Sequence, residues 1–442
     1  MVNSSLIALG KTISRISQTL NRGNGSTWPG HIALKGNPNF IKDILSHSPT
    51  KIIIVAGTNG KTTTSGLIRT GLEKNGKTVI QNTSGANLLN GVASTLLLNT
   101  NKQGRLIQDY AIFEVDENAL PHVLKQVTPD YLVLLNLFRD QLDRYGEINI
   151  ITQKWQEAIN KLSNKTKLIL NADDPQIAYL GLGLSNVIAS EAKQSNSILY
   201  FSLETSKTNQ QSHQAADSIS CPKCGNKLTF ENITFSHLGK WKCNNCGLHQ
   251  PKYSLNTFSF YPLEGTYNKY NTIAAALVLK DLGIKETQIE DAFKTFAPAF
   301  GRQEIINYQG KKMQLFLSKN PTSFNQSYAT IQELHATTLL IILNDRIPDG
   351  RDISWIWDVD LPEIKSFKHI FVAGDRVYDM ALRLKYELDE IQYKKQVETF
   401  ENIGQAIAKG IQILSSDEML YILPNYSAML EARKVLTGKK IL

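Results

Sequence analysis

The segment GTNGKT at residues 57–62 is the strongest candidate for chemistry in this chain. It lies between an apolar run, IIIVA, and a helical pattern, which is the setting of a phosphate-binding loop. In such a loop, backbone N–H groups and the helix N-terminus point at phosphate oxygens. Lys61 is expected to reach the β- and γ-phosphates, and the Thr62 hydroxyl to bind Mg²⁺. The strict pattern has glycine at position 55, where this chain has Val55. The expected nucleotide contacts in this segment are Gly57, Thr58, Asn59, Gly60, Lys61, Thr62 and Thr63.

Acidic residues follow the next apolar run along the chain, in the string FEVDE. They are Glu114, Asp116 and Glu117. Because the carboxyl ends of parallel strands meet at one edge of a sheet, we expect one of these acids to hold Mg²⁺ beside the phosphates. Glu114 is favoured because it directly follows the apolar run, and with Lys61 it is the expected catalytic pair. A solvated acidic strand end is the alternative interpretation.

All four cysteines fall in two CxxC pairs, which are separated by 18 residues. This spacing is typical of a zinc ribbon with the ligands Cys221, Cys224, Cys243 and Cys246. Four thiolates complete a tetrahedral shell, so the predicted zinc is structural. Free buried thiols are one alternative, and a ribbon that binds nucleic acid through its flanking lysines is another.

Apolar runs of strand length alternate with helical patterns from residue 51 onward. The runs expected to be strands are 52–57, 110–115, 131–136 and 167–171. Their alternation with helices predicts a mainly parallel sheet covered by helices. A polar stretch at 204–220 leads into the cysteine insert, which spans about residues 215–252, and helical patterns return at 271–283 and 286–296.

Three further apolar runs, 338–345, 369–375 and 419–425, each end in Asn, Asp or Gly and predict a second, Rossmann-like α/β unit. The fold class is therefore α/β, with three expected parts along the chain. These are an N-terminal helical segment at 1–50, an ATP-binding domain at 51–300 that carries the inserted ribbon, and a smaller C-terminal domain at 301–442.

The N-terminal helical pattern places Leu6, Leu9, Ile13, Ile16 and Leu20 on one face, with Lys11, Arg15 and Arg22 elsewhere. Burial of that face against the next domain is one interpretation. A basic amphipathic surface that touches anionic lipid is the other.

The composition is that of an ordinary folded protein. Hydrophobic residues make up 42% and charged residues 20% of 442 residues, which excludes a chain that is mainly disordered. The net charge of +8 permits an anionic partner but identifies none. No apolar run approaches the length of a membrane span, and the N-terminus lacks the basic start of a secretory signal. A cytoplasmic protein is therefore expected, with peripheral contact to the inner face of the membrane left open.

Several strings resemble the ATP-binding motifs of the Mur ligases and folylpolyglutamate synthases. They are GTNGKTTT, FEVDE, NADDP at 171–175, GTYNKYNTIAAA at 265–276 and GRQE at 301–304. The resemblance implies that ATP and Mg²⁺ activate a carboxylate as an acyl phosphate, which an amine then attacks. It also implies that Asn268 and Asn271 line the nucleotide and that Arg302 reaches its phosphates. The usual histidine before the first asparagine is Tyr267 here, so no second metal contact is carried over to that position.

A more particular resemblance is to the MurT family, the Mur-ligase-like subunits of lipid II isoglutaminyl synthases. Only about fifty residues precede the phosphate loop, fewer than a separate UDP-binding domain needs. The chain adds the cysteine insert, the string NLFRDQLDRYGEI at 136–148, and LNDRIPDGRDISWIWDVD at 343–360. The resemblance implies amidation of the α-carboxylate of D-glutamate in the stem peptide of lipid II. It further implies a glutaminase partner of the GatD type that supplies ammonia, and no nucleic acid.

The same resemblance gives the DGRD string a role at the interface with the glutaminase. Asp352 matches the acid that completes a Cys–His–Asp triad across that interface, while Asp349 is the alternative, whose neighbour Gly350 suggests a turn. The charged loop at 139–147 is either solvated or contacts substrate or partner, and Trp355 and Trp357 are either core residues or partner anchors. An autonomous Mur-type amino-acid ligase and a nucleotide-dependent ribbon protein that binds nucleic acid are the rival functions.

Overall fold

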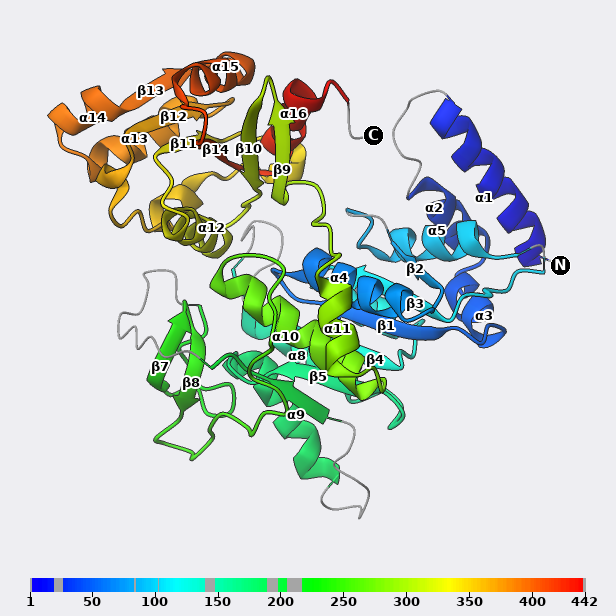
Figure 1. Ribbon diagram of the computed structural model, residues 1–442. Helices are drawn as coiled ribbons and strands as arrows, with labels where there is room; N and C mark the ends of the chain where they lie inside the picture. Colours follow the sequence, from blue (N-terminus) through cyan, green and yellow to red (C-terminus); the bar gives the residue numbers. More distant parts are fainter. Residues whose placement is uncertain are drawn as a thin grey trace.

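The computed structural model describes residues 2–19, 27–82, 85–101, 103–139, 148–188, 198–204 and 217–439. Residues 140–147 of the charged loop, and 205–216 of the polar stretch before the cysteines, lie outside the described residues. The described chain forms two six-stranded sheets and one two-stranded hairpin (Figure 1).

The first sheet is parallel throughout and has the strand order β2-β3-β1-β4-β5-β6. Its strands are β1 (Lys51–Ala56), β2 (Val79–Gln81), β3 (Tyr110–Val115), β4 (Tyr131–Leu134), β5 (Lys167–Asn171) and β6 (Ile198–Phe201). The strands read as continuous apolar runs because helices cover both faces of a parallel sheet. In β1, Ile52 and Ile54 pack into the core on one face, and Ile53 and Val55 into the core on the other.

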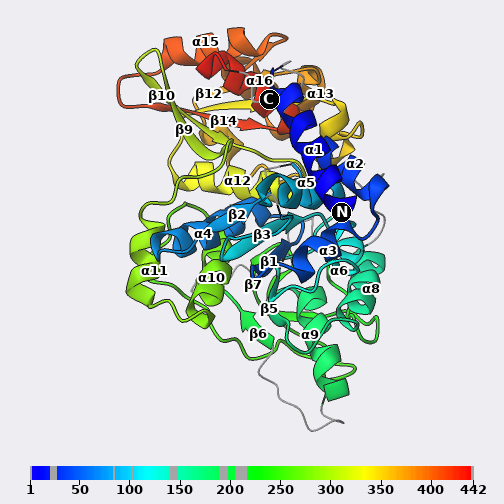
Figure 2. The ribbon, with the colours of Figure 1, turned by 90° about the vertical axis from the view of Figure 1, so that its right-hand side faces the viewer.

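Helices cover the two faces of this sheet unequally. On one face lie α4 (Lys61–Lys74), α10 (Thr266–Asp281) and α11 (Glu286–Phe293). The other face carries α5 (Leu89–Asn99), α6 (Leu120–Leu124), α8 (Ile148–Ile159) and α9 (Pro175–Ile188). Figure 2 shows these helices on opposite sides of the sheet.

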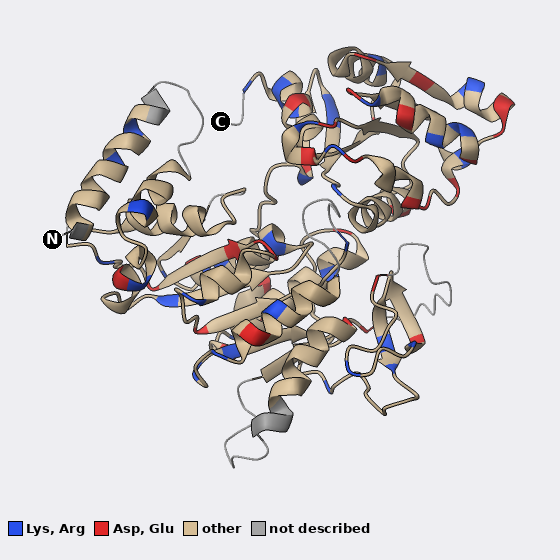
Figure 3. Cartoon of the chain, turned by 180° about the vertical axis from the view of Figure 1, so that it is seen from behind, with Lys and Arg blue, Asp and Glu red and all other residues tan. Residues whose placement is uncertain are grey.

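The N-terminal segment forms α1 (Val2–Thr19), α2 (Trp28–Gly36) and α3 (Phe40–Ser46), which lie on the α5 side of the sheet. The expected apolar face of α1 is only partly right. Leu6 and Ile13 are half-buried, but Leu9 and Ile16 are 49% and 52% exposed, because the helix contacts α2 and α5 through the neighbouring stripe of Ile7, Gly10 and Ser14. Within α1 the charged residues are Lys11 and Arg15, both basic (Figure 3).

The cysteine insert contains the antiparallel hairpin of β7 (Thr229–Phe235) and β8 (Leu238–Lys242). It lies beside α10 in Figure 1. Its attachment is to the turn after β5, where Trp241 Nε1 donates to Ala172 O at 3.0 Å and Gly239 N donates to Asp173 O at 3.1 Å. The insert is therefore fixed to the carboxyl edge of the first sheet.

The second sheet has the order β13-β12-β11-β14-β10-β9, in which the edge strand β9 alone pairs antiparallel. Its strands are β9 (Arg302–Tyr308), β10 (Lys311–Phe316), β11 (Thr338–Ile342), β12 (His369–Ala373), β13 (Val397–Phe400) and β14 (Met419–Pro424). The helices around it are α12 (Pro321–Glu333), α13 (Val377–Glu387), α14 (Glu390–Gln396), α15 (Ile403–Ile413) and α16 (Tyr426–Thr437). Short 3-10 turns lie at Ile347–Asp349, Ser354–Asp358 and Ile364–Ser366.

The expected α/β class, with parallel-rich sheets and a smaller second unit, is confirmed. Among the described helices, none has the length and apolarity that a bilayer crossing requires.

Candidate active site

The phosphate loop connects β1 to α4 and is held in shape by the segment that follows β4. Thr58 N donates to Asn136 O at 2.9 Å, and Asn59 exchanges two hydrogen bonds with the Asn136 amide, at 2.9 and 3.1 Å. Gly57 and Gly60 have φ values of 140° and 91°. A Cβ at Gly60 would lie 2.1 Å from Asn271 Oδ1, so both backbone angle and space require glycine there.

Lys61 and Thr62 begin α4 and meet acidic side chains from the neighbouring strand β3. Thr62 Oγ1 donates to Glu114 Oε2 at 2.8 Å, and Lys61 Nζ lies 3.3 Å from Glu117 Oε2. Lys61 Nζ also donates to the carbonyl oxygens of Gly57 and Thr58. The ammonium thus lies inside the loop, where phosphate oxygens would replace the carbonyls as its partners.

Burial governs the charge of the three acids. It raises the pKa of Glu114, against the opposing effects of Arg302 and the Thr62 hydroxyl. Burial also raises the pKa of Asp116, with the charge of Glu117 adding to the effect. For Glu117, burial is outweighed by Lys61 and Lys319, which hold its pKa below the usual value. Glu117 is therefore a carboxylate paired with Lys61, and Glu114 is a buried carboxylate whose ionised form a bound cation would stabilise.

The pair of Thr62 and Glu114 fits Mg²⁺. A hydroxyl and a carboxylate oxygen 2.8 Å apart are hard oxygen donors of the kind Mg²⁺ selects, and the cation keeps its other positions for water and phosphate. Gln81 Nε2 donates to Glu114 Oε1 at 3.2 Å, and Asn82 Oδ1 accepts from Glu114 N at 2.8 Å. These contacts orient the carboxylate before any ion is present.

Asn268 and Asn271 lie one turn apart on α10 and face the loop. Asn271 Nδ2 donates to Asn268 Oδ1 at 3.2 Å, and Asn268 Nδ2 donates to Glu264 O at 2.7 Å. Tyr267, at the position of the usual histidine, accepts a hydrogen bond at its hydroxyl from Gln303 Nε2 at 3.0 Å. The asparagine pair thus reaches the phosphate loop from the helix opposite.

A cavity of about 400 Å³ lies between the two α/β units and brings these residues together. The first unit contributes the phosphate loop, Glu114 and both asparagines, and the second unit contributes Arg302, the first residue of β9. The second unit contributes Lys319 and Tyr426, which the sequence analysis missed. Lys319 directly precedes the cap of α12, where Asn320 Oδ1 accepts from Ser323 N at 2.8 Å. The string SKNP after an apolar run is a helix-start signal that could have drawn attention to it.

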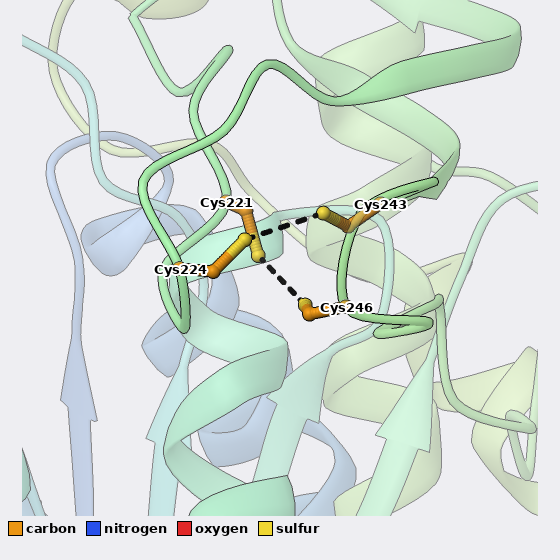
Figure 4. Close-up of side chains that lie close together, drawn as sticks. All are labelled: Cys221, Cys224, Cys243 and Cys246. Atoms are coloured by element: carbon orange, nitrogen blue, oxygen red, sulfur yellow. Dashed lines mark hydrogen bonds between the residues drawn. The ribbon is translucent and has the colours of Figure 1, made fainter.

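The four cysteines form one cluster, in which all the sulfurs lie within 4.8 Å of one another (Figure 4). The Sγ atoms of Cys221 and Cys246 are 3.6 Å apart, and those of Cys224 and Cys243 are 3.5 Å apart. Tetrahedral zinc with Zn–S bonds of about 2.3 Å would separate its sulfurs by about 3.8 Å. The backbone N–H of Asn226 lowers the pKa of Cys224 to about 6, whereas burial raises the pKa of Cys221, so the fit to zinc rests on the sulfur positions. The cluster therefore fits zinc.

The DGRD string separates its two acids. Asp349 is buried and accepts from both the backbone N–H and the hydroxyl of Ser427 at the start of α16. Asp352 is exposed, and within the described part of the chain its carboxylate contacts Ser354 alone, whose N–H donates to it at 2.8 Å. That contact lowers the pKa of Asp352. Nearby, Trp355 packs against the core, while Trp357 is 45% exposed.

Comparison with known proteins places this site in a family. Residues 55–279 match the Mur ligase middle domain, and residues 317–429 match the MurT ligase C-terminal domain. The subunit MurT of lipid II isoglutaminyl synthase (glutamine-hydrolyzing) from Staphylococcus aureus (strain COL) is 32% identical over 443 residues, covering 96% of this chain and 95% of the relative. The chain belongs to the MurT family. The subunit of the same name from Streptococcus pneumoniae (strain ATCC BAA-255 / R6) is also 32% identical, over 95% of this chain and 94% of its own length.

Solved structures support the fold of this MurT family member. A pseudomurein peptide ligase type C from Methanothermus fervidus has a TM-score of 0.65 at 20% identity, covering 90% of this chain and 81% of the other. A folylpolyglutamate synthase from Mycobacterium tuberculosis has a TM-score of 0.57 at 15% identity, covering 91% and 95%. The matching family model and the MurT relatives confirm the Mur ligase family predicted from the motifs, and the Mur ligase fold implies ATP and Mg²⁺.

Proposed function

We propose that this chain is the synthase subunit of a lipid II isoglutaminyl synthase. It would amidate the α-carboxylate of D-glutamate in the lipid II stem peptide. The observation that carries the proposal is a phosphate loop joined to a metal-binding hydroxyl and carboxylate, Thr62 and Glu114, in a chain of the MurT family. Lipid II would present its peptide to the cavity between the two units.

The first step transfers a phosphoryl group. A carboxylate oxygen of the substrate attacks the γ-phosphorus of ATP, the bond to the β-phosphate oxygen breaks, and ADP leaves with that electron pair. Lys61, with the N–H groups of residues 57–60, would stabilise the charge that moves toward the β–γ bridge. Thr62 and Glu114 would hold Mg²⁺, which would neutralise negative charge on the phosphate groups. Arg302 and Lys319 line the same cavity and would contact the outer phosphate oxygens.

The second step forms the amide. Ammonia attacks the acyl carbon, phosphate leaves with the C–O electron pair, and the nitrogen releases a proton. Ammonia is small and needs no amino-acid pocket. We propose that it comes from a glutaminase subunit, because the S. aureus and S. pneumoniae relatives are named glutamine-hydrolyzing.

The two asparagines of α10 complete the nucleotide site in this account. Asn271 lies against Gly60, and Asn268 is fixed by Glu264 O and Asn271. The cysteine cluster is a structural zinc site in the same account, since four thiolates leave no coordination position for a substrate.

We propose that Asp352 serves the glutaminase rather than the ligase. Its exposed carboxylate, ionised at neutral pH, can accept from a partner's histidine and stabilise the imidazolium form. Asp349 is committed to Ser427 within the chain and is therefore the weaker candidate.

The test is purification of the chain with its glutaminase and assay of ATP-dependent amidation of lipid II by mass spectrometry. Lipid II whose D-glutamate carboxylate carries ¹⁸O should transfer one label to inorganic phosphate, because the acyl phosphate forms through that oxygen. ATP turnover that requires an amino acid instead of ammonia would support an autonomous amino-acid ligase. Label that stays out of phosphate would contradict the acyl phosphate.

A further inference from the structure

The hairpin of the cysteine insert reaches into the cavity that the proposed function assigns to ATP. Two of its residues, Phe235 at the end of β7 and Leu238 at the start of β8, line the cavity together with the phosphate loop. Phe138 and Tyr270 line the same end. A metal module that only stabilised a distant part of the fold would have no residues there.

Aromatic contacts hold this end of the cavity together. The rings of Phe235 and Phe138 are stacked with centroids 6.1 Å apart, and Phe235 meets Tyr270 edge-on at 5.7 Å. These three residues come from the hairpin, the segment after β4 and helix α10. The wall therefore forms only when the insert docks on the first unit.

The docking is specific and buried. His237, at the hairpin turn, lies 3.4 Å from Asp174 through Nε2, and both side chains are inaccessible to solvent. Asp173 accepts hydrogen bonds from Tyr270 at 2.5 Å and from Gln250 at the end of the insert. The turn of the hairpin is thus fixed relative to the phosphate loop.

The strand order of the first sheet shows where this aromatic wall lies relative to the phosphate loop. The metal-binding Glu114 lies on β3, on one flank of β1, and marks the position of the β- and γ-phosphates. Phe138 follows β4 on the other flank, and the insert is attached after β5, one strand further out. A nucleotide with its phosphates beside Glu114 would meet this wall when its base extends toward β4 and β5.

We propose that Phe235 of the hairpin, backed by the fully buried Leu238, forms the base-binding wall of the nucleotide site, so that the zinc ribbon positions ATP as well as stabilising the fold. The base would lie against apolar and aromatic surface, which suits any flat purine face. Since β7 and β8 lie between the two cysteine pairs, the metal holds together the open end of the hairpin whose turn contacts the cavity. This inference rests on the nucleotide site of the proposed function.

The test compares ADP with tripolyphosphate, each titrated with Mg²⁺ into the zinc-loaded full chain by calorimetry. Phe235→Ala should weaken ADP binding by about fivefold or more, the usual effect of losing an aromatic contact to a base, and leave tripolyphosphate binding within twofold. Leu238→Ala should weaken ADP binding in the same direction. Phe230→Ala is the matched control, because Phe230 is half-buried on the same strand but does not line the cavity.

Zinc content, measured for each variant, reports whether the insert is folded. Unchanged ADP affinity in zinc-loaded Phe235→Ala and Leu238→Ala would overturn the inference. So would an equal loss of ADP and tripolyphosphate affinity, or the same loss of ADP affinity in Phe230→Ala, because the insert would then act only through stability. If the wild-type chain bound neither ligand, the proposed ATP site itself would fall.

Discussion

The two sheets present very different carboxyl edges to their surroundings. At the edge of the first sheet the charged groups are buried and paired within the chain, as Lys61 is with Glu117 and Thr62 with Glu114. After β11 of the second sheet, the loop exposes Asp352, which contacts only Ser354 among the described residues. Ligand sites occur at both kinds of edge in open α/β sheets. We propose from this difference that the first site is complete in this chain and that the second needs a partner.

Replacement of the buried Lys61 should give the largest effect, a loss of catalytic rate. Lys61→Ala is expected to lower the rate of ATP-dependent amidation by about 10²-fold or more, because its ammonium lies inside the loop, where it donates to the carbonyl oxygens of Gly57 and Thr58. The measurement is the rate of ADP formation in the assembled enzyme with saturating ammonium. Arg69→Ala, an exposed residue further along α4 that pairs with Glu73, is the control and should retain activity. A Lys61→Ala enzyme of normal rate would remove the phosphate loop from the mechanism.

Loss of one cysteine of the insert should give the next largest effect, which is a loss of stability. Cys243→Ser is expected to lose zinc and to lower the first thermal transition by about 5 °C or more, because a three-ligand site binds zinc weakly and the insert depends on it. Elemental analysis and calorimetry measure the two quantities. Zinc-free wild-type protein with unchanged thermal unfolding would contradict a structural role for the metal.

A smaller effect is expected on the pH dependence of the unfolding free energy, through the buried Asp173. Burial outweighs the hydrogen bonds from Tyr270 and Ser202 and raises its pKa to about 6 from 3.8. The native state then binds this proton more tightly than the unfolded state, so its contribution to stability is present at pH 4 and is lost as the pH rises through about 6. At about 1.4 kcal/mol per pKa unit, the loss is about 3 kcal/mol.

Denaturant unfolding between pH 4 and pH 7 tests this sign. The wild-type chain should lose more unfolding free energy over that range than Asp173→Asn, whose amide does not titrate there. Equal slopes for the two proteins would show that the native pKa of Asp173 is not raised.

Much of the fold was predictable because its central strands are short apolar runs. The runs at 110–115, 167–171, 338–345 and 419–425 all contain strands of the structure. The edge strands β2, β6, β9 and β13 were not predicted, and neither was β10 beside β9. Three of the edge strands, β2, β6 and β13, are only three or four residues long, and β9 mixes polar with apolar residues, as RQEIINY. The exposure of Leu9 and Ile16 in α1 could not be predicted, because it follows from the contacts of α1 with α2 and α5, which the local sequence does not contain.

The residues of the candidate site also fall into a predictable group and an unpredictable group. The phosphate loop is a local motif, and its glycines, lysine and threonine are adjacent in sequence. Lys319 and Tyr426 enter the same cavity from the second unit, more than 250 residues away from the loop, and only the docking of the two units brings them there. The contribution of Phe235 was hidden for a related reason, because the insert reads as a separate module until its hairpin is seen against α10.

The most direct measurement of the contrast between the two edges compares ammonia sources in the assembled enzyme that carries Asp352→Asn. Glutamine-driven amidation of lipid II should fall by about 10²-fold or more, the scale expected when a triad acid becomes an amide, while amidation driven by added ammonium stays at the wild-type rate. Loss of both activities in a folded, partner-binding variant would place Asp352 in the ligase chemistry. Retention of both would leave it a surface residue, and the account of an edge that requires a partner would be contradicted.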